Sequence, residues 1–209
     1  MPPNAPVTTL ERRRRLGRRA QWLAAASVAY NAVEAVVAVT AGAAASSIAL
    51  IGFGLDSVVE MSSAFVILWQ FRHPLPESRE RLALRLIGVS FLALAAYVTV
   101  ESLRQLFGGA DADPSPVGIA LACASLVVMP ALSVAQRRTG RALGSGSVVA
   151  DSKQTLLCTY LSAVLLVGLV ANATLGWSWV DPLVGLVVAA VAAREGVQAW
   201  RGDACCDVC

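Results

Sequence analysis

Long apolar runs separated by short polar breaks dominate the chain. Windows of about 20 mainly apolar residues occur at six places: residues 21–43, 47–71, 83–107, 116–136, 147–174 and 178–199. The runs lack the period-two alternation of a membrane β-barrel, and in lipid only helices or closed barrels satisfy their own backbone hydrogen bonds. The pattern therefore predicts an all-α, polytopic membrane protein with six transmembrane helices.

Composition indicates the same class. Of the 209 residues, 56% are hydrophobic and 15% are charged, and the mean hydropathy is +0.64. These values lie far from those of an ordinary soluble domain. The sequence has no basic face interleaved with aromatic residues, so the expected partner is the lipid bilayer and no nucleic acid.

The arginines predict how the chain is threaded, because cytoplasmic loops near span ends carry an excess of Lys and Arg. Arginines lie before the first run and after the second, fourth and sixth runs, whereas the other three connections contain neither Lys nor Arg. Both termini are therefore expected to be cytoplasmic. Three parts follow: a basic N-terminal segment at residues 1–20, a six-helix transmembrane domain at 21–200 and a cysteine-rich cytoplasmic tail at 201–209.

The first run is expected to remain in the protein as a span. It is longer than the roughly 7 to 15 residue apolar core of a signal peptide, and it contains Asn31 and Glu34. The expected location is the cell membrane, plasma or inner, with several passes.

The second run contains two acidic residues, Asp56 and Glu60, near its middle. A charged side chain at the bilayer centre costs roughly 2.5 to 3.5 kcal/mol on insertion scales, so the pair would cost about twice that if both stayed ionised and unpaired. Residues four apart share one face of a helix, with an offset of about 6 Å. The two carboxylates can therefore hold one ion together.

The fifth run offers a second group of donors, Asp151, Gln154 and Cys158. Gln154 and Cys158 share a face through their spacing, and Asp151 lies on a similar face. Because the second and fifth helices are expected to run antiparallel, their donors can meet near mid-depth. In the first run, Glu34 is a further candidate for the same cavity, while an interhelical hydrogen bond explains Asn31 equally well.

Carboxylate, amide and thiol donors at this spacing suit a divalent transition metal, and zinc accepts carboxylate and thiolate in tetrahedral sites. A bound metal ion would neutralise the buried acids. When the ion leaves, the acids should take up protons, because an ionised carboxylate is costly in a low dielectric. The pattern thus predicts exchange of metal for protons, with the metal as substrate and no permanently bound cofactor.

Simpler explanations exist for some of these residues. A single acid such as Asp151 is often paired with a neighbouring polar group, for which Lys153 is a candidate, and a lone buried cysteine such as Cys158 is commonly an apolar filler. The tail carries three further thiols, Cys205, Cys206 and Cys209. In a reducing cytosol these thiols could capture a soft metal, or the tail could have no role.

Three motifs resemble the cation diffusion facilitator family. The letters S-I-A-L at residues 47–50, ahead of the acidic pair, resemble that family's second transmembrane helix. The letters A-D-S-K-Q at 150–154, running on to Cys158, resemble its fifth helix. The letters D-P-L-V-G-L at 181–186 resemble the opening of its sixth helix.

The resemblance implies a transporter that exports zinc or a similar divalent ion in exchange for protons, usually as a homodimer. It places the transport site at Asp56 and Glu60 with Gln154 and Cys158. Gln154 and Cys158 stand where the family has His and Asp, which leaves the metal's identity open and makes Asp151 a substitute candidate. We expect a short member of the family without its C-terminal cytoplasmic domain, with the cysteine tail as a hypothetical loading site in its place.

The sequence as a whole predicts a zinc efflux transporter, a metal/proton antiporter with its site between the second and fifth helices. One alternative is a carrier for another divalent cation such as iron, manganese or cobalt. Another is a membrane sensor or scaffold that binds metal without moving it. An enzyme is not expected, because the sequence has no evident nucleophile and base pair, His-rich zinc site or phosphate-binding loop.

Overall fold

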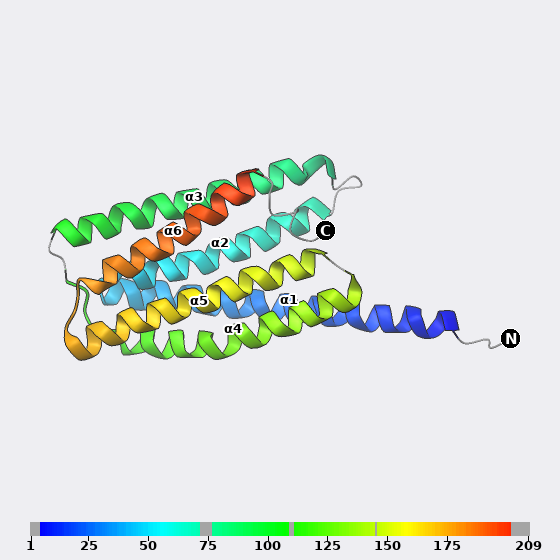
Figure 1. Ribbon diagram of the computed structural model, residues 1–209, viewed down its shortest axis with the longest axis horizontal. Helices are drawn as coiled ribbons and strands as arrows, with labels where there is room; N and C mark the ends of the chain where they lie inside the picture. The colour runs from blue at the N-terminus through cyan, green and yellow to red at the C-terminus, as the bar shows by residue number, and fades with distance from the viewer. Residues whose placement is uncertain (1–4, 72–76, 109–110, 145, 202–209) are drawn as a thin grey trace.

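The computed structural model describes residues 5–71, 77–108, 111–144 and 146–201, and the regular structure in these ranges is helical throughout. Six helices follow one another along the chain: α1 (Ala5–Ala44), α2 (Ile48–Phe71), α3 (Glu77–Gly108), α4 (Pro116–Leu143), α5 (Gly146–Leu175) and α6 (Val180–Arg201). They lie roughly along one axis, and α1 begins at the end of the bundle where α6 ends (Figure 1). The predicted all-α class with six helices is confirmed.

The helices are long enough to cross a bilayer. By length and composition, four of them contain candidate spans among the described residues: Arg14–Ala44, Arg85–Gly108, Pro116–Leu143 and Asp151–Leu175. The other two, α2 and α6, have 24 and 22 residues, which corresponds to about 36 and 33 Å against a hydrocarbon core of about 30 Å. Because α2 packs against α1, α3, α5 and α6, its acidic residues can face other helices instead of lipid.

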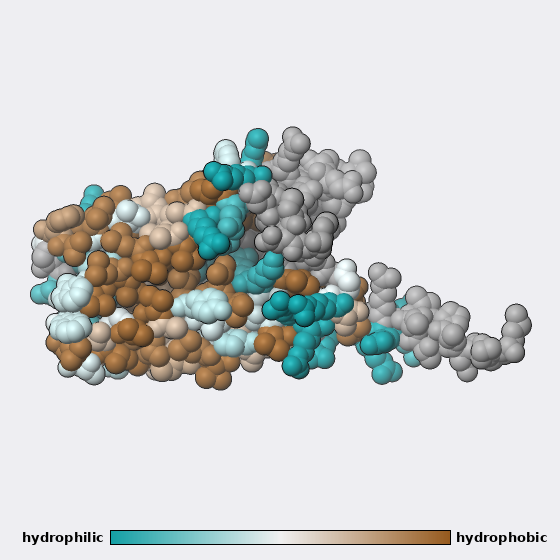
Figure 2. Space-filling view, in the orientation of Figure 1, coloured by the Kyte–Doolittle hydropathy of each residue, from teal (hydrophilic) through white to brown (hydrophobic). Residues whose placement is uncertain are grey.

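Apolar side chains cover much of the outside of the bundle. Val33 on α1, Val127 on α4 and Val167 on α5 are 63%, 73% and 69% exposed. Figure 2 shows hydrophobic residues over the side of the bundle, with hydrophilic residues gathered toward the end at which α1 begins. Such an extensive apolar surface suits lipid tails rather than water.

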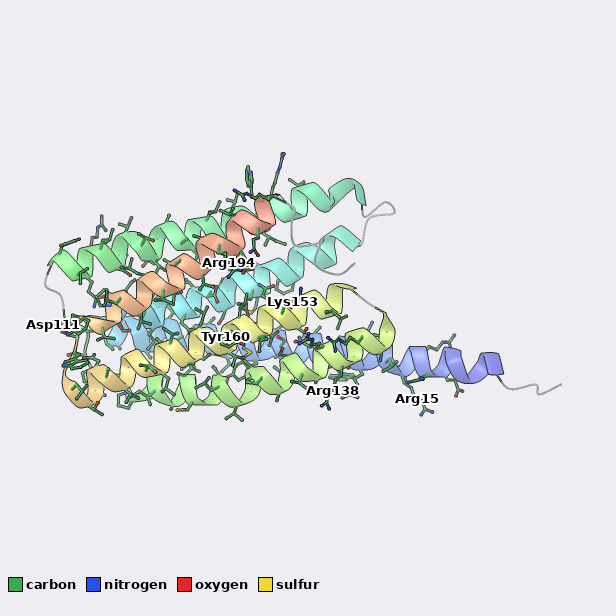
Figure 3. The ribbon with its side chains drawn as sticks, viewed as in Figure 1. Arg15, Asp111, Arg138, Lys153, Tyr160 and Arg194 are labelled. Carbon is green, nitrogen blue, oxygen red and sulfur yellow. The ribbon has the colours of Figure 1, made fainter. Side chains whose placement is uncertain are left out.

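The two ends of the bundle differ in charge. Arg15 and Arg138 lie toward the end at which α1 begins, and Asp111 lies at the opposite end (Figure 3). The basic segment before residue 21 is helical from Ala5 and continues directly into the first span as part of α1. The start of α1 and the end of α6 lie toward the same end of the bundle (Figure 1). The cytoplasmic placement of both termini stays a prediction.

Small residues allow the helices to approach closely. At Gly54 of α2, an added Cβ would lie 2.9 Å from the Cβ of Ala38 on α1. At Gly88 of α3, it would lie 2.9 Å from the carbonyl oxygen of Gly196 on α6. Without a hydrophobic driving force between helices in lipid, such close contact is a main source of helix association.

Local sequence fixes where α4 starts and stops. Ser115 has an extended backbone and its hydroxyl accepts a hydrogen bond from the backbone N–H of Gly118 at 3.1 Å, while Pro116 occupies the first helical position. After Leu143, Gly144 adopts the left-handed conformation with φ 65° and its N–H donates to the carbonyl of Arg141. These are favoured start and stop signals of a helix.

The start of α2 is joined to the start of α6. The Ser47 hydroxyl donates to Oδ1 of Asp181 at 2.5 Å, and the backbone N–H of Ala49 donates to Oδ2 at 3.3 Å. The Ser47 oxygen in turn accepts from the N–H of Leu50 at 3.1 Å. Two of the family-like motifs, S-I-A-L and D-P-L-V-G-L, therefore meet at the end of the bundle opposite the start of α1 (Figure 1).

Candidate metal site

A cavity of about 40 Å³ lies between α1, α2 and α5. That volume exceeds the roughly 10 to 15 Å³ that one water molecule needs. Its walls comprise Ala24, Ser27, Val28 and Asn31 from α1, Glu60 and Met61 from α2, and Asp151, Gln154 and Thr155 from α5. Three of the donors expected from the sequence, Glu60, Asp151 and Gln154, thus share one cavity.

Glu60 is held in place by α1. Nδ2 of Asn31 donates to Oε2 of Glu60 at 2.9 Å, which orients the carboxylate at the cavity wall. Asn31 is 5% exposed, and within the described part of the chain its Oδ1 has no hydrogen-bond partner. The interhelical hydrogen bond expected for Asn31 is present, and it leaves an amide oxygen unused.

Asp151 is held in place by α4. Nε2 of Gln136 donates to Oδ2 of Asp151 at 2.7 Å, and Oε1 of Gln136 accepts from the Thr155 hydroxyl at 3.0 Å. Gln136 is 1% exposed, so its buried amide links α4 to the two cavity-lining residues of α5. Gln136 is thus one partner of Asp151, and the pairing of Asp151 with Lys153 stays a prediction.

A second polar cluster surrounds Glu34, which is fully buried. Its carboxylate accepts hydrogen bonds from the hydroxyl of Ser57 on α2 at 2.7 Å, from the hydroxyl of Ser125 on α4 and from the thiol of Cys158 on α5 at 3.9 Å. The Tyr30 hydroxyl lies 2.9 Å from the Ser125 oxygen. Four helices therefore meet at one carboxylate.

The donors expected from the sequence are thus divided between two neighbouring groups. Glu60, Asp151 and Gln154 line the cavity, whereas Cys158 is 1% exposed, belongs to the hydrophobic core and contacts Glu34. Asp56, one turn before Glu60, is buried, does not line the cavity and lies within electrostatic range of Glu34 and Glu60.

These donors do not form a closed metal site. Among the described residues, no three His, Cys, Asp or Glu side chains are grouped closely enough to hold one ion. Glu60 of α2 lines the cavity together with Asp151 and Gln154 of α5, whereas Asp56 and Cys158 do not. The shared metal site stays a prediction, and an ion in the cavity would draw on amide oxygens as well as carboxylates. The tail thiols Cys205, Cys206 and Cys209 lie outside the described residues.

Sequence reasoning missed several members of both groups. Ser57, Ser125 and Gln136 gave no signal, because hydroxyl and amide side chains are common in membrane helices and fasten them together. Glu34 did give a signal, since an ionisable residue inside a span is functional by default. Away from both groups, Glu101 forms an ion pair with Arg104 on α3, with an N–O distance of 2.7 Å.

The bundle has an apolar exterior, and its carboxylates and amides face an internal cavity. These are the features of a polytopic membrane protein that keeps its polar groups inside. Residues 24–201 match the sequence profile of the cation efflux transmembrane domain. The chain belongs to the cation efflux family, and the resemblance to cation diffusion facilitators is confirmed.

Two relatives extend this comparison. Over 152 residues the chain is 27% identical to an uncharacterized transporter of Synechocystis sp., which covers 68% of this chain and 49% of the relative. Over 185 residues it is 20% identical to Transmembrane protein 163 of Xenopus laevis, which covers 87% of this chain and 66% of the relative. The chain therefore matches about half of the first relative's length and just under two thirds of the second's.

Proposed function

We propose that this cation efflux protein exports a divalent metal ion, with zinc as the first candidate, in exchange for protons. The observation that carries the proposal is the cavity between α1, α2 and α5, in which Glu60, Asp151 and Gln154 meet. Membership of the cation efflux family supports movement of a cation through the bundle. The identity of the ion, the exchange for protons and the use of this cavity are parts of the proposal.

The chemistry follows from the donors. Two carboxylates and an amide oxygen can replace part of a metal ion's hydration shell, and their negative charge balances a divalent ion. Once the ion has left, two ionised carboxylates in a low dielectric repel each other and cost free energy, so protons should replace the metal. Export of one metal ion would then be accompanied by entry of protons.

A flux assay with purified protein in liposomes tests this. With a zinc-sensitive dye inside and a pH gradient across the membrane, the wild type should move Zn²⁺ and move protons in the opposite direction. Glu60→Gln keeps the shape and an acceptor oxygen but removes the charge, and it should slow transport by at least about tenfold. Glu101→Gln is the matched control, because Glu101 pairs with Arg104 and does not line the cavity.

The same vesicles separate the alternatives. Metal binding without flux would replace the exporter by a sensor or scaffold. Zn²⁺ flux that is insensitive to the pH gradient would remove the exchange for protons. A competition series with manganese, iron and cobalt would rank the substrates. Light scattering in detergent would test the expected homodimer. Labelling of the termini in cells would test their expected cytoplasmic placement and the expected location in the cell membrane.

A further inference from the structure

The side of the cavity formed by α1 carries an unexplained polar atom. Asn31 lines the cavity, is 5% exposed and uses its Nδ2 on Glu60 at 2.9 Å. Its Oδ1 accepts no hydrogen bond from the described part of the chain. A buried carbonyl oxygen without a partner costs free energy, and native proteins keep few of them.

The orientation of the Asn31 amide follows from its neighbour. The carboxylate of Glu60 only accepts hydrogen bonds when ionised, so the NH₂ group of Asn31 must face it and the oxygen must face elsewhere. With Nδ2 committed to Glu60, Oδ1 is the atom left for whatever occupies the cavity. A cation would be attracted by Glu60 and Asp151 on the same walls. Such a cation would also provide the partner that the Asn31 oxygen lacks.

We infer that Oδ1 of Asn31 is a ligand of the transported cation, so that α1 completes a site otherwise shared by α2 and α5. The inference rests on the proposed function and adds a third helix to it. Asn31 then has two roles at once, because it binds the ion through Oδ1 and fixes Glu60 through Nδ2.

The inference also narrows the class of substrate. Every donor it brings together in the cavity is an oxygen: the carboxylates of Glu60 and Asp151 and the amides of Asn31 and Gln154. The thiol of Cys158 contacts Glu34 and does not line this cavity. Oxygen ligands suit divalent ions such as Mn²⁺ and are accepted by Zn²⁺, whereas thiolate and thioether ligands select Cu(I).

Fastening between helices is the competing explanation for Asn31. An interhelical hydrogen bond needs only the NH₂ group. A residue that only positioned Glu60 through this group would lose metal affinity equally in Asn31→Ala and Asn31→Asp, because both changes remove the NH₂ group. Asn172 on α5 provides the matched comparison, because it is 4% exposed and its Nδ2 donates to the carbonyl of Ala112 at 2.8 Å outside the cavity.

The test measures binding of Zn²⁺ and Mn²⁺ to the full chain in lipid nanodiscs by calorimetry. Asn31→Ala should raise both dissociation constants by about 10- to 100-fold. Asn31→Asp keeps an oxygen at the same reach and should bind both ions far more tightly than Asn31→Ala. Asn172→Ala should lower the unfolding temperature and leave both constants unchanged. If Asn31→Ala does not fold, Asn31→Leu, which fills the space without an oxygen, is measured in its place.

Two results would overturn the inference: wild-type affinity in Asn31→Ala or Asn31→Leu, or an equal loss of affinity in Asn31→Asp and Asn31→Ala. Failure of the proposed function looks different, because the wild type itself would then bind neither ion or would bind without moving it. The Asn31 variants therefore test the ligand, whereas wild-type binding in nanodiscs and wild-type flux in liposomes test the proposed function.

Discussion

Removing the carboxylate of Asp181 should loosen the start of α2. Asp181 is 3% exposed and accepts hydrogen bonds from the Ser47 hydroxyl at 2.5 Å and from the Ala49 N–H at 3.3 Å. Ser47 is 0% and Ala49 is 1% exposed, so water cannot readily replace the lost acceptor. Each buried donor left unsatisfied costs about 1 to 3 kcal/mol, and Asp181→Ala should therefore lower the free energy of unfolding by about 2 to 6 kcal/mol.

Denaturant unfolding of the purified protein in mixed micelles, followed by helical circular dichroism, measures this loss. Asp181→Asn retains one acceptor oxygen and should lose less than Asp181→Ala. In the double variant with Ser47→Ala, the combined loss should be smaller than the sum of the two single losses, because the residues share one hydrogen bond.

Metal binding and transport can be measured on the same variants. Asp181 does not line the cavity, so the metal dissociation constant of the folded Asp181→Ala protein should stay within about twofold of the wild type. Transport should fall more, because α2 carries both Asp56 and Glu60 and has lost its anchor on α6. Wild-type stability in Asp181→Ala, or strictly additive losses in the double variant, would refute the reasoning.

Two other changes probe the packing around the site. Glu34→Ala removes the acceptor of three buried donors, of which the Ser57 hydroxyl keeps the Phe53 carbonyl oxygen at 3.4 Å. At about 1 to 3 kcal/mol for each of the other two donors, the change should cost at least about 2 kcal/mol of unfolding free energy. An unchanged denaturation midpoint would contradict the role given to this carboxylate. Gly54→Val places atoms within 2.9 Å of Ala38 and should destabilise the protein by about 1 to 3 kcal/mol through overpacking. Gly17→Ala is its control, since an added Cβ there meets nothing within 4 Å, and it should stabilise α1 by about 0.5 to 1 kcal/mol in the same unfolding experiment.

The helices and the main site-bearing faces could be predicted from the sequence. Apolar runs of about 20 residues mark spans because lipid requires them, and all six runs are helical in the structure. The four-residue spacing of Asp56 and Glu60 places both on the inward side of α2, and the donors of α5 face the same interior. Local periodicity carries this information, because it depends only on 3.6 residues per turn.

The long-range partners could not be predicted in the same way. Ser47 and Asp181 are 134 positions apart, and Ser125 and Glu34 are 91 positions apart. Which of many serines reaches a given carboxylate depends on helix crossing and rotation, and these are set by contacts such as Gly54 against Ala38. One sequence records the small residues and the hydroxyls, but it does not record how they combine.

The division of the donors into two groups bears on how a carrier would work. A site that gathered all carboxylates and the thiol around one ion would bind it tightly and release it slowly, whereas conduction requires binding weak enough to leave. Here Gln154 lines the cavity, and Cys158, one turn further along α5, contacts Glu34. On the proposed function, a small shift of α5 against α1 and α2 would change which group faces the ion, and that change in coordination is what an exporter needs in order to let its substrate go.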